Sequence, residues 1–262
     1  MNSKITFPFW KYQGTGNDFI LVDNRNLDFP KDDIDFIDHL CNRRLGIGAD
    51  GLILLEDDEL SDFRMVYFNS DGKESTMCGN GGRCIVAFAR ELGIIKDEAC
   101  FTAVDGPHRA RVQGEQIELE MIDVDKIDDV RNHSFLNTGS PHHVQLVENL
   151  STLDVKREGA KIRYGIYGET GSNINFVEQK SHDTFNVRTY ERGVEDETLS
   201  CGTGVTAVAL AMHQTGKTHA QAVTVKTPGG NLKVQFAKSG EGYSNVRLSG
   251  PATKVFEGQW QV

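Results

Sequence analysis

Two cysteines open similar segments of the sequence, and their setting suits acid–base chemistry. Cys78 opens the run CGNGGRCIVAFARELG, and Cys201 opens the run CGTGVTAVALAMHQTG. Both runs begin Cys-Gly-(Asn/Thr)-Gly, continue with mostly apolar, helix-compatible residues and stop at a glycine. The start of a helix favours the thiolate form of a cysteine, and its unpaired backbone N–H groups bind anions. The pattern therefore predicts two activated thiols, each beside a site for a carboxylate.

Two thiols of this kind can invert an amino-acid α-carbon without a cofactor. One group removes a weakly acidic proton from one face of the carbon, and a second group delivers a proton to the opposite face. The negative charge of the carbanion delocalises into the carboxylate, where N–H donors stabilise it. One cysteine must start as the thiolate and the other as the thiol, so the two titrate as a coupled pair.

The spacing of the cysteines, histidines and glycines argues against a metal site or a nucleotide-binding site. Cys78 and Cys84 are six residues apart and lack the second close pair of a zinc site. His142 and His143 could form a metal pair, but neighbours in a strand point to opposite faces. The glycine-rich GIGADG (46–51) lacks the strand and helix that surround a dinucleotide fingerprint. We therefore expect no metal and no cofactor, and we expect the other three cysteines to pack as small apolar side chains.

The two helices that carry Cys78 and Cys201 should be buried. Both are apolar nearly all round, as is typical of a helix inside a core. Asn80 and Thr203 are residue types that favour the N-cap position, and each run ends on a glycine that suits the position after the last turn. These signals predict two helices of similar length that begin beside the cysteines.

The two helices belong to a longer internal repeat. They are offset by 123 residues, and Tyr67 and Tyr190 recur at the same offset within five pairs of similar segments. A repeat of this length predicts two similar halves, residues 1–130 and 131–262. Each half contains short strands, one amphipathic helix and the buried helix, around which a curved sheet would wrap. The expected fold class is therefore α/β of the α+β type.

Composition narrows the class of partner. The chain has 262 residues, 38% of them hydrophobic, and a net charge of −10. The negative charge argues against nucleic acid or an anionic membrane as the main partner. No apolar run marks a secretory signal or a membrane span. Five cysteines, an odd number, suit reduced thiols, so we expect a cytoplasmic protein that acts on a small molecule.

Further motifs complete the pattern of a known family. In chain order they are GTGNDF (14–19), GIGADG (46–51), FNSDGKESTMCGNGGRC (68–84), GSPHHV (139–144), SNINFVE (172–178), YERGVEDETLSCGTG (190–204) and TPGG (227–230). Together they resemble the diaminopimelate epimerase family over nearly the whole chain. The most specific feature is the pair of CG(N/T)G helices, preceded by NSDG in one half and ERG in the other.

The resemblance implies a fold and an activity. The fold would be two pseudo-symmetric halves, each a mixed, mostly antiparallel sheet around a central helix. The activity would be that of an isomerase, independent of pyridoxal phosphate, that interconverts LL- and meso-diaminopimelate in lysine and peptidoglycan precursor synthesis. Cys78 and Cys201 would be its catalytic acid and base. Diaminopimelate is then the expected partner, and a homodimer is compatible with the sequence.

The resemblance also implies which residues bind the substrate. The backbone at Gly79, Asn80, Gly202 and Thr203 would hold the reacting carboxylate, and His142 would support the site. The side chains that would hold the amino and carboxylate groups are Asn17, Asn69, Ser140, Asn173, Glu191 and Arg192. Two positions depart from the family pattern, since many members have Gln where Gly51 stands and Asn where Ser140 stands. Ser140 keeps a hydroxyl group, whereas Gly51 offers no side chain.

Three alternative functions share some of these features. A proline or hydroxyproline racemase-type enzyme would use the same pair of thiols, but it needs apolar enclosure rather than Arg192 and several asparagines. A thiol oxidoreductase or redox sensor would need a CxxC or resolving-cysteine pattern, which the sequence lacks. An amino-acid-binding protein without catalysis would have no need of both thiols.

Overall fold

The computed structural model describes residues 6–261, which fold into two compact units. Unit 1 comprises the chain up to residue 119 and again from residue 251, and unit 2 comprises residues 120–250. The last strand, β18 (Thr253–Gln261), pairs antiparallel with β1 (Thr6–Gly14) and so belongs to unit 1. The division expected from the sequence, 1–130 and 131–262, places this strand in the second half. The difference arises because the repeat shows only the order of similar segments. It does not show that the last strand pairs with the first strand of the chain.

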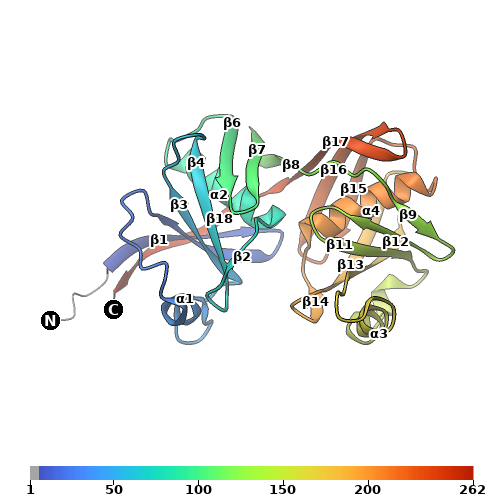
Figure 1. The fold of residues 1–262 in the computed structure, drawn as a ribbon, viewed down its shortest axis with the longest axis horizontal. Helices are drawn as coiled ribbons and strands as arrows, with labels where there is room; N and C mark the ends of the chain where they lie inside the picture. The colour runs from blue at the N-terminus through green and yellow to red at the C-terminus, as the bar shows by residue number, and fades with distance from the viewer. Residues whose placement is uncertain (1–5, 262) are drawn as a thin grey trace. The chain divides into compact units, whose positions relative to one another are not determined.

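Unit 1 is a mixed sheet around a buried helix (Figure 1). Its further strands are β2 (Asn17–Asp23), β3 (Gly51–Glu56), β4 (Phe63–Asn69), β5 (Glu74–Ser75), β6 (Glu98–Ala103), β7 (Gly106–Gln113) and β8 (Gln116–Glu120). β2 pairs antiparallel with β1 and parallel with β3, while β4 pairs antiparallel with β3 and parallel with β6. Helix α1 (Ile34–Cys41) connects β2 to β3, and α2 (Gly79–Glu91) connects β5 to β6.

Unit 2 has the same plan. Its strands are β9 (Asp128–Val130), β10 (His133–Asn137), β11 (Pro141–Leu146), β12 (Asn173–Gln179), β13 (Thr184–Glu191), β14 (Asp196–Thr198), β15 (Ala222–Thr227), β16 (Gly230–Ser239) and β17 (Gly242–Pro251). The 3₁₀ turn η1 (Leu150–Thr152) and helix α3 (Val155–Tyr167) connect β11 to β12, and α4 (Gly202–Gln214) connects β14 to β15.

The order of strand pairings is the same in both units. From β1 or β10 onward, each unit runs through an antiparallel, a parallel, an antiparallel and a parallel pairing. Two antiparallel hairpin pairings complete each sheet. The helices lie in the connections between parallel neighbours, because only a long crossover can join parallel strands. This duplicated arrangement confirms the expected fold class, two similar halves of mixed sheet around a central helix.

Helices α2 and α4 form the centres of the two units. In α2 the side chains of Ile85, Val86, Phe88 and Ala89 have no exposed surface, and in α4 the run from Ala207 to Ala211 has none. Burial on all sides follows from side chains that are apolar all round. Each helix spans 13 residues. Within residues 6–261, no helix is both long enough and apolar enough to cross a membrane.

The ends of α2 and α4 follow the sequence signals in part. Gly93 and Gly216 lie just after the helices with φ of +74° and +69°, and their N–H groups bond to Arg90 and His213. The next residue in each case bonds one carbonyl further back, which completes the Schellman motif. At the other end the prediction of Asn80 and Thr203 as N-caps is wrong, because the cysteine before each glycine takes that position.

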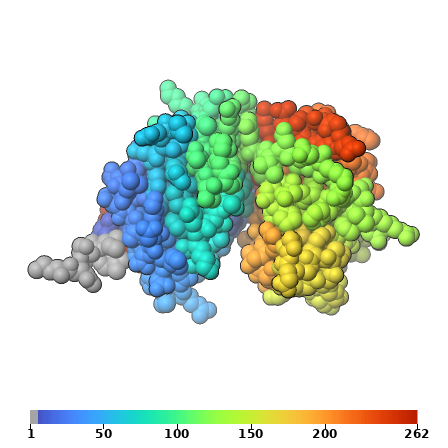
Figure 2. All heavy atoms as spheres, in the orientation of Figure 1, coloured from blue at the N-terminus to red at the C-terminus, as the bar shows by residue number. Residues whose placement is uncertain are grey.

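Helices α1 and α3 lie on the outer surfaces of their units. Each begins after an aspartate, Asp33 or Asp154, whose carboxylate accepts a backbone N–H of the first turn. Helix α1 buries Ile37 and Leu40 against its sheet. Helix α3, visible as yellow spheres in Figure 2, buries Val155 in the same way. These are the amphipathic helices expected in each half.

Two glycines in α3 offer a matched test of this packing. A Cβ at Gly159 would lie 2.6 Å from Cγ of Tyr190, whereas a Cβ at Gly165 would meet nothing within 4 Å. We expect Gly159→Ala to lower the free energy of unfolding by about 1–3 kcal/mol through overpacking. Gly165→Ala should raise it by about 0.5–1 kcal/mol, because alanine favours the helix. Urea unfolding of both variants measures the difference, and equal effects would contradict the close contact with Tyr190.

Candidate active site

Cys78 caps the start of α2 with its own sulfur. Its backbone is extended (φ −100°, ψ 145°), and its Sγ accepts the N–H of Gly81 at 3.2 Å. A Cβ at Gly81 would lie 3.2 Å from that sulfur, so a glycine suits the position. The side chain of Cys78 is half-buried. The start of α2 at Gly79 and Asn80 is the positive end of the helix dipole, which favours a carboxylate nearby.

A buried arginine contacts the first turn of this helix. Arg83 has no exposed surface. Its guanidinium donates to the carbonyl oxygen of Gly79 at 3.0 Å, to Oδ1 of Asn80 at 2.9 Å and to Oγ1 of Thr15 at 3.3 Å. Burial lowers the pKa of Arg83 to about 10, and attraction to Cys84 and Cys78 acts in the opposite direction. Arg83 therefore stays charged at neutral pH and stabilises negative charge on Cys78.

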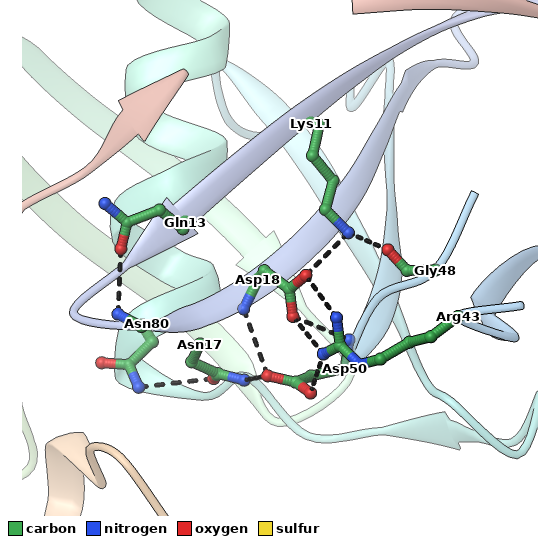
Figure 3. A network of polar contacts seen from close by, with 9 residues as sticks. Lys11, Gln13, Asn17, Asp18, Arg43, Gly48, Asp50 and Asn80 are labelled. Carbon is green, nitrogen blue, oxygen red and sulfur yellow. Dashed lines mark hydrogen bonds and ion pairs between the residues drawn. The ribbon is translucent and has the colours of Figure 1, made fainter. Parts of the chain in front are cut away.

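Asn17 joins this site from the β1–β2 hairpin. Thr15 and Gly16 at the tip both have positive φ, 51° and 87°, which is the conformation of a tight two-residue hairpin. The turn brings Asn17 to the start of α2, where its Oδ1 accepts from the Asn80 amide at 3.3 Å. Its Nδ2 donates to Oδ2 of Asp50 at 2.6 Å. Figure 3 shows the Asn17 amide held between these two side chains.

Asp50 in turn belongs to a charged network (Figure 3). Arg43 contacts Oδ1 of Asp50 at 2.7 Å and Oδ1 of Asp18 at 2.6 Å. Lys11, which is almost fully buried, lies 2.8 Å from Asp18 and also donates to the Gly48 carbonyl. Burial alone would raise the pKa of Asp18, but hydrogen bonds from Arg43 and Lys11 hold it well below its usual range. The network fixes Asp50, and through it the orientation of Asn17.

Cys201 occupies the matching position in unit 2. It is the N-cap of α4, it is buried, and its Sγ lies 3.4 Å from Oγ1 of Thr203. Oγ1 of Thr203 in turn lies 2.9 Å from Nε2 of His142 on β11. Oγ1 of Thr138 donates to the Thr203 carbonyl at 2.9 Å and ties the preceding loop to the helix start. The sulfur of Cys201 is thus linked through Thr203 to His142 in the sheet.

The direction of these hydrogen bonds can be derived from one backbone group. Nδ2 of Asn175 donates to the His143 carbonyl at 2.9 Å, and a carbonyl can only accept. The same amide nitrogen lies 3.1 Å from Nδ1 of His142, so Nδ1 must be the acceptor. Neutral His142 then carries its proton on Nε2 and donates it to Thr203. Thr203 is left free to donate its hydroxyl proton to the sulfur of Cys201.

Burial keeps His142 neutral. The side chain has no exposed surface, and burial together with the positive charge of Arg192 lowers its pKa to about 3. The next residue, His143, is also buried on the opposite face of the strand, and burial lowers its pKa to about 4. The two rings do not converge on one point. Among the described residues, no group of three or more His, Cys, Asp or Glu side chains is placed to hold a metal.

The remaining residues expected in unit 2 are also brought together. Asn173 donates from Nδ2 to Oγ of Ser140 at 2.9 Å and accepts the backbone N–H of Arg192 at 2.9 Å. Arg192 is exposed and donates to the Thr170 carbonyl, and Oε2 of Glu191 accepts from Thr198 at 2.7 Å. Asn173 therefore joins the Ser140 loop to the segment that carries Glu191 and Arg192. Whether each side chain touches a substrate remains a prediction.

Asn69 completes the set in unit 1, and three supporting residues were not expected. Asn69 ends β4 as an exposed residue, and its Oδ1 accepts from the hydroxyl of Tyr67 at 2.9 Å. The residues that the sequence did not single out are Arg83, Asp50 and Asn175. Each is a polar group that holds a candidate residue in place. Arg83 alone carried a visible signal, because it is a charge inside an otherwise apolar helix.

The model of a family described as diaminopimelate epimerase matches residues 9–128 and 134–255. This chain belongs to the diaminopimelate epimerase family. The curated diaminopimelate epimerase of Flavobacterium psychrophilum is 59% identical over 250 residues, which cover 95% of this chain and 98% of that protein. That of Chlorobaculum tepidum is 44% identical over 260 residues, covering 94% and 98%. The resemblance noted in the sequence is confirmed.

Solved structures of more distant proteins share the fold of this diaminopimelate epimerase family member. A Bacillus anthracis phenazine biosynthesis protein of the PhzF family superposes with a TM-score of 0.76 at 16% identity, covering 98% of this chain and all of that one. A hydroxyproline epimerase from Agrobacterium vitis superposes with a TM-score of 0.68 at 14% identity, covering 98% and 93%. At such low identity these structures support the architecture and not a particular substrate.

Because His142 and His143 are buried, we predict that the free energy of unfolding falls in mild acid. In the unfolded chain they titrate near pH 6.5, whereas their folded pKa values are about 3 and about 4. Below pH 6.5 the unfolded state therefore binds more protons, and stability falls as the pH drops toward 4. Each histidine should contribute a slope of about 1.4 kcal/mol per pH unit. Urea unfolding at pH 7 and pH 5 measures this, and His143→Gln should show about half the slope. Equal stability at both pH values would contradict the prediction.

Proposed function

We propose that this chain interconverts LL- and meso-diaminopimelate, as an isomerase that needs no cofactor, in lysine and peptidoglycan precursor synthesis. One observation carries the proposal: in each unit a buried helix begins at a cysteine N-cap, and both cysteines lie within the residues that match the diaminopimelate epimerase family model. The curated relatives that cover nearly the whole chain bear that name. Five free thiols fit a cytoplasmic enzyme.

The proposed chemistry is proton transfer at the α-carbon by the two thiols. One thiolate removes the proton, and the other cysteine returns a proton to the opposite face. The charge of Arg83 supports a thiolate at Cys78, because the two attract each other. The hydroxyl of Thr203, oriented by His142, supports charge on Cys201 by donating to its sulfur. Proton transfer in the reverse direction uses the same two groups with their roles exchanged.

Stabilisation of the carbanion is assigned to the helix starts. Removal of the α-proton spreads negative charge into the carboxylate, and preorganised N–H donors stabilise that charge. The backbone at Gly79 and Asn80 and at Gly202 and Thr203 would supply these donors. The side chains proposed to hold the rest of the substrate are Asn17, Asn69, Ser140, Asn173, Glu191 and Arg192. Arg192 is suited to a carboxylate because its guanidinium can donate two parallel hydrogen bonds.

Replacement of either cysteine tests the two-base assignment. We expect Cys78→Ser and Cys201→Ser each to lower the rate of epimerisation by about 10² to 10⁴-fold, because a hydroxyl is a poor base. The measurement is the conversion of LL- to meso-diaminopimelate, with deuterium incorporation at the α-carbon in D₂O followed by NMR to separate proton exchange from inversion. Cys100→Ser, at a half-buried position, and Cys41→Ser, at a buried one, are the matched controls and should keep the parent rate.

Three outcomes would overturn the proposal. One is substantial epimerisation by either site variant. Another is a parent enzyme that exchanges the α-proton of proline or trans-4-hydroxyproline but not that of diaminopimelate. A third is the failure of both single variants to eliminate halide from either α-configuration of a β-halogenated analogue, since the thiol that each variant retains is the one base that this step needs.

Substitution of Arg83 tests the charge beneath Cys78. Arg83→Met removes the guanidinium and keeps a long apolar side chain. In the pH profile of kcat/KM, the acidic limb should move to higher pH by about one unit or more. The loss of a nearby positive charge raises the pKa of the thiol. Arg90→Met, at an exposed position near the other end of α2, should leave the profile in place. A profile that is lower but has the same shape would show that Arg83 acts only on folding.

A further inference from the structure

We propose that Tyr67 is a positioning residue of the substrate site. Its phenol occupies the space that a side chain at position 51 would need, and its hydroxyl orients Asn69 so that the Asn69 amide NH₂ is offered to a substrate carboxylate. This inference deepens the proposed function and rests on it, because Asn69 is one of the proposed substrate-binding residues.

The space beside Gly51 is filled by Tyr67. A Cβ at position 51 would lie 2.7 Å from Cε2 and 3.2 Å from Oη of Tyr67, and 2.5 Å from the Phe68 carbonyl oxygen. Real Cβ atoms do not approach ring or carbonyl atoms so closely, so any side chain at 51 would have to displace the ring or strand β4. The glycine at this position thus makes room for the phenol.

Strand register explains why the phenol reaches this point. Gly51 lies directly opposite Asn69 in the antiparallel pair of β3 and β4, and Ile53 lies opposite Tyr67. Residues two apart in a strand point to the same face, so Tyr67 and Asn69 share one face of the sheet. The ring of Tyr67 packs edge-on against Phe19, with centroids 5.9 Å apart. The hydroxyl is therefore held on a rigid, buried ring next to the exposed end of the strand.

The contact with Asn69 fixes the orientation of its amide. The Tyr67 hydroxyl donates to Oδ1 of Asn69 at 2.9 Å. With Oδ1 turned toward the buried ring, the NH₂ group of the exposed Asn69 side chain turns outward. An amide NH₂ donates and suits a carboxylate, whereas the amide oxygen would repel one. Without the hydroxyl the amide is free to rotate and can present the wrong end.

The variant Tyr67→Phe tests this role, because it keeps the ring and removes only the hydroxyl. We expect the KM for diaminopimelate to rise by about 3- to 10-fold, the effect of one hydrogen bond, with kcat changed by less than about twofold. The matched control is Tyr12→Phe, which also deletes a buried hydroxyl in unit 1. That hydroxyl donates to Glu91, at the last residue of α2. Tyr12→Phe should leave both constants unchanged.

A double-mutant cycle shows whether Tyr67 acts through Asn69. Dissociation constants for meso-diaminopimelate are measured by calorimetry with Tyr67→Phe, Asn69→Ala and the double variant, all in the slow Cys201→Ser background. We expect Tyr67→Phe to weaken binding by about 3- to 10-fold when Asn69 is present, and by less than about 1.5-fold when residue 69 is alanine. Additive effects would overturn the inference.

The inference and the proposed function fail in different ways. If the parent enzyme turns over diaminopimelate and Tyr67→Phe has the parent KM, only the role of Tyr67 is wrong. If the parent enzyme does not epimerise diaminopimelate, the proposed function is wrong and the inference falls with it.

Discussion

The site in each unit depends on one constraint: the first backbone N–H groups of a buried helix have no partner within the helix itself. A helix that is apolar all round can begin inside a core only if polar groups accept the backbone N–H groups of its first turn. In α2 the sulfur of Cys78 accepts one of these N–H groups. The glycines after Cys78 and Cys201 let other chain segments approach closely, as at Gly204, where a Cβ would lie 2.6 Å from the Asn175 oxygen. The proposed reactive group and the N-cap of the helix are therefore the same residue.

The two units repeat their backbone but not their polar chemistry. In both helices the residue four positions after the first glycine donates to that glycine's carbonyl at 3.0 Å, Arg83 to Gly79 and Thr206 to Gly202. One is a full positive charge and the other is a neutral hydroxyl. Beside Cys201 the supporting groups are also neutral, because His142 cannot be protonated near pH 7. An asymmetric setting suits a pair of thiols in which one starts charged and the other starts protonated.

Behind these residues lies a layer of side chains that hold the candidate contacts in place. Asp50 orients Asn17, Tyr67 orients Asn69, and Asn175 sets the tautomer of His142. Each of these groups is anchored in turn, Asp50 by Arg43, Tyr67 by its packing against Phe19, and Asn175 by the His143 carbonyl and Thr189. Such a layer limits the rotation of the site residues, and accurate placement of donors is what makes them effective against developing charge.

The sequence by itself determined the features that local chemistry can encode. Apolar residues on all sides of two runs, closed by Gly93 and Gly216, predict the buried helices and their ends, and the repeat predicts two similar halves. The tertiary structure decided what depends on contacts between distant segments. It placed β18 beside β1, made the cysteines rather than Asn80 and Thr203 the caps, and filled the space at Gly51 with Tyr67. Strand partners and the space around a glycine are set by the whole fold, so no local pattern of residues reports them.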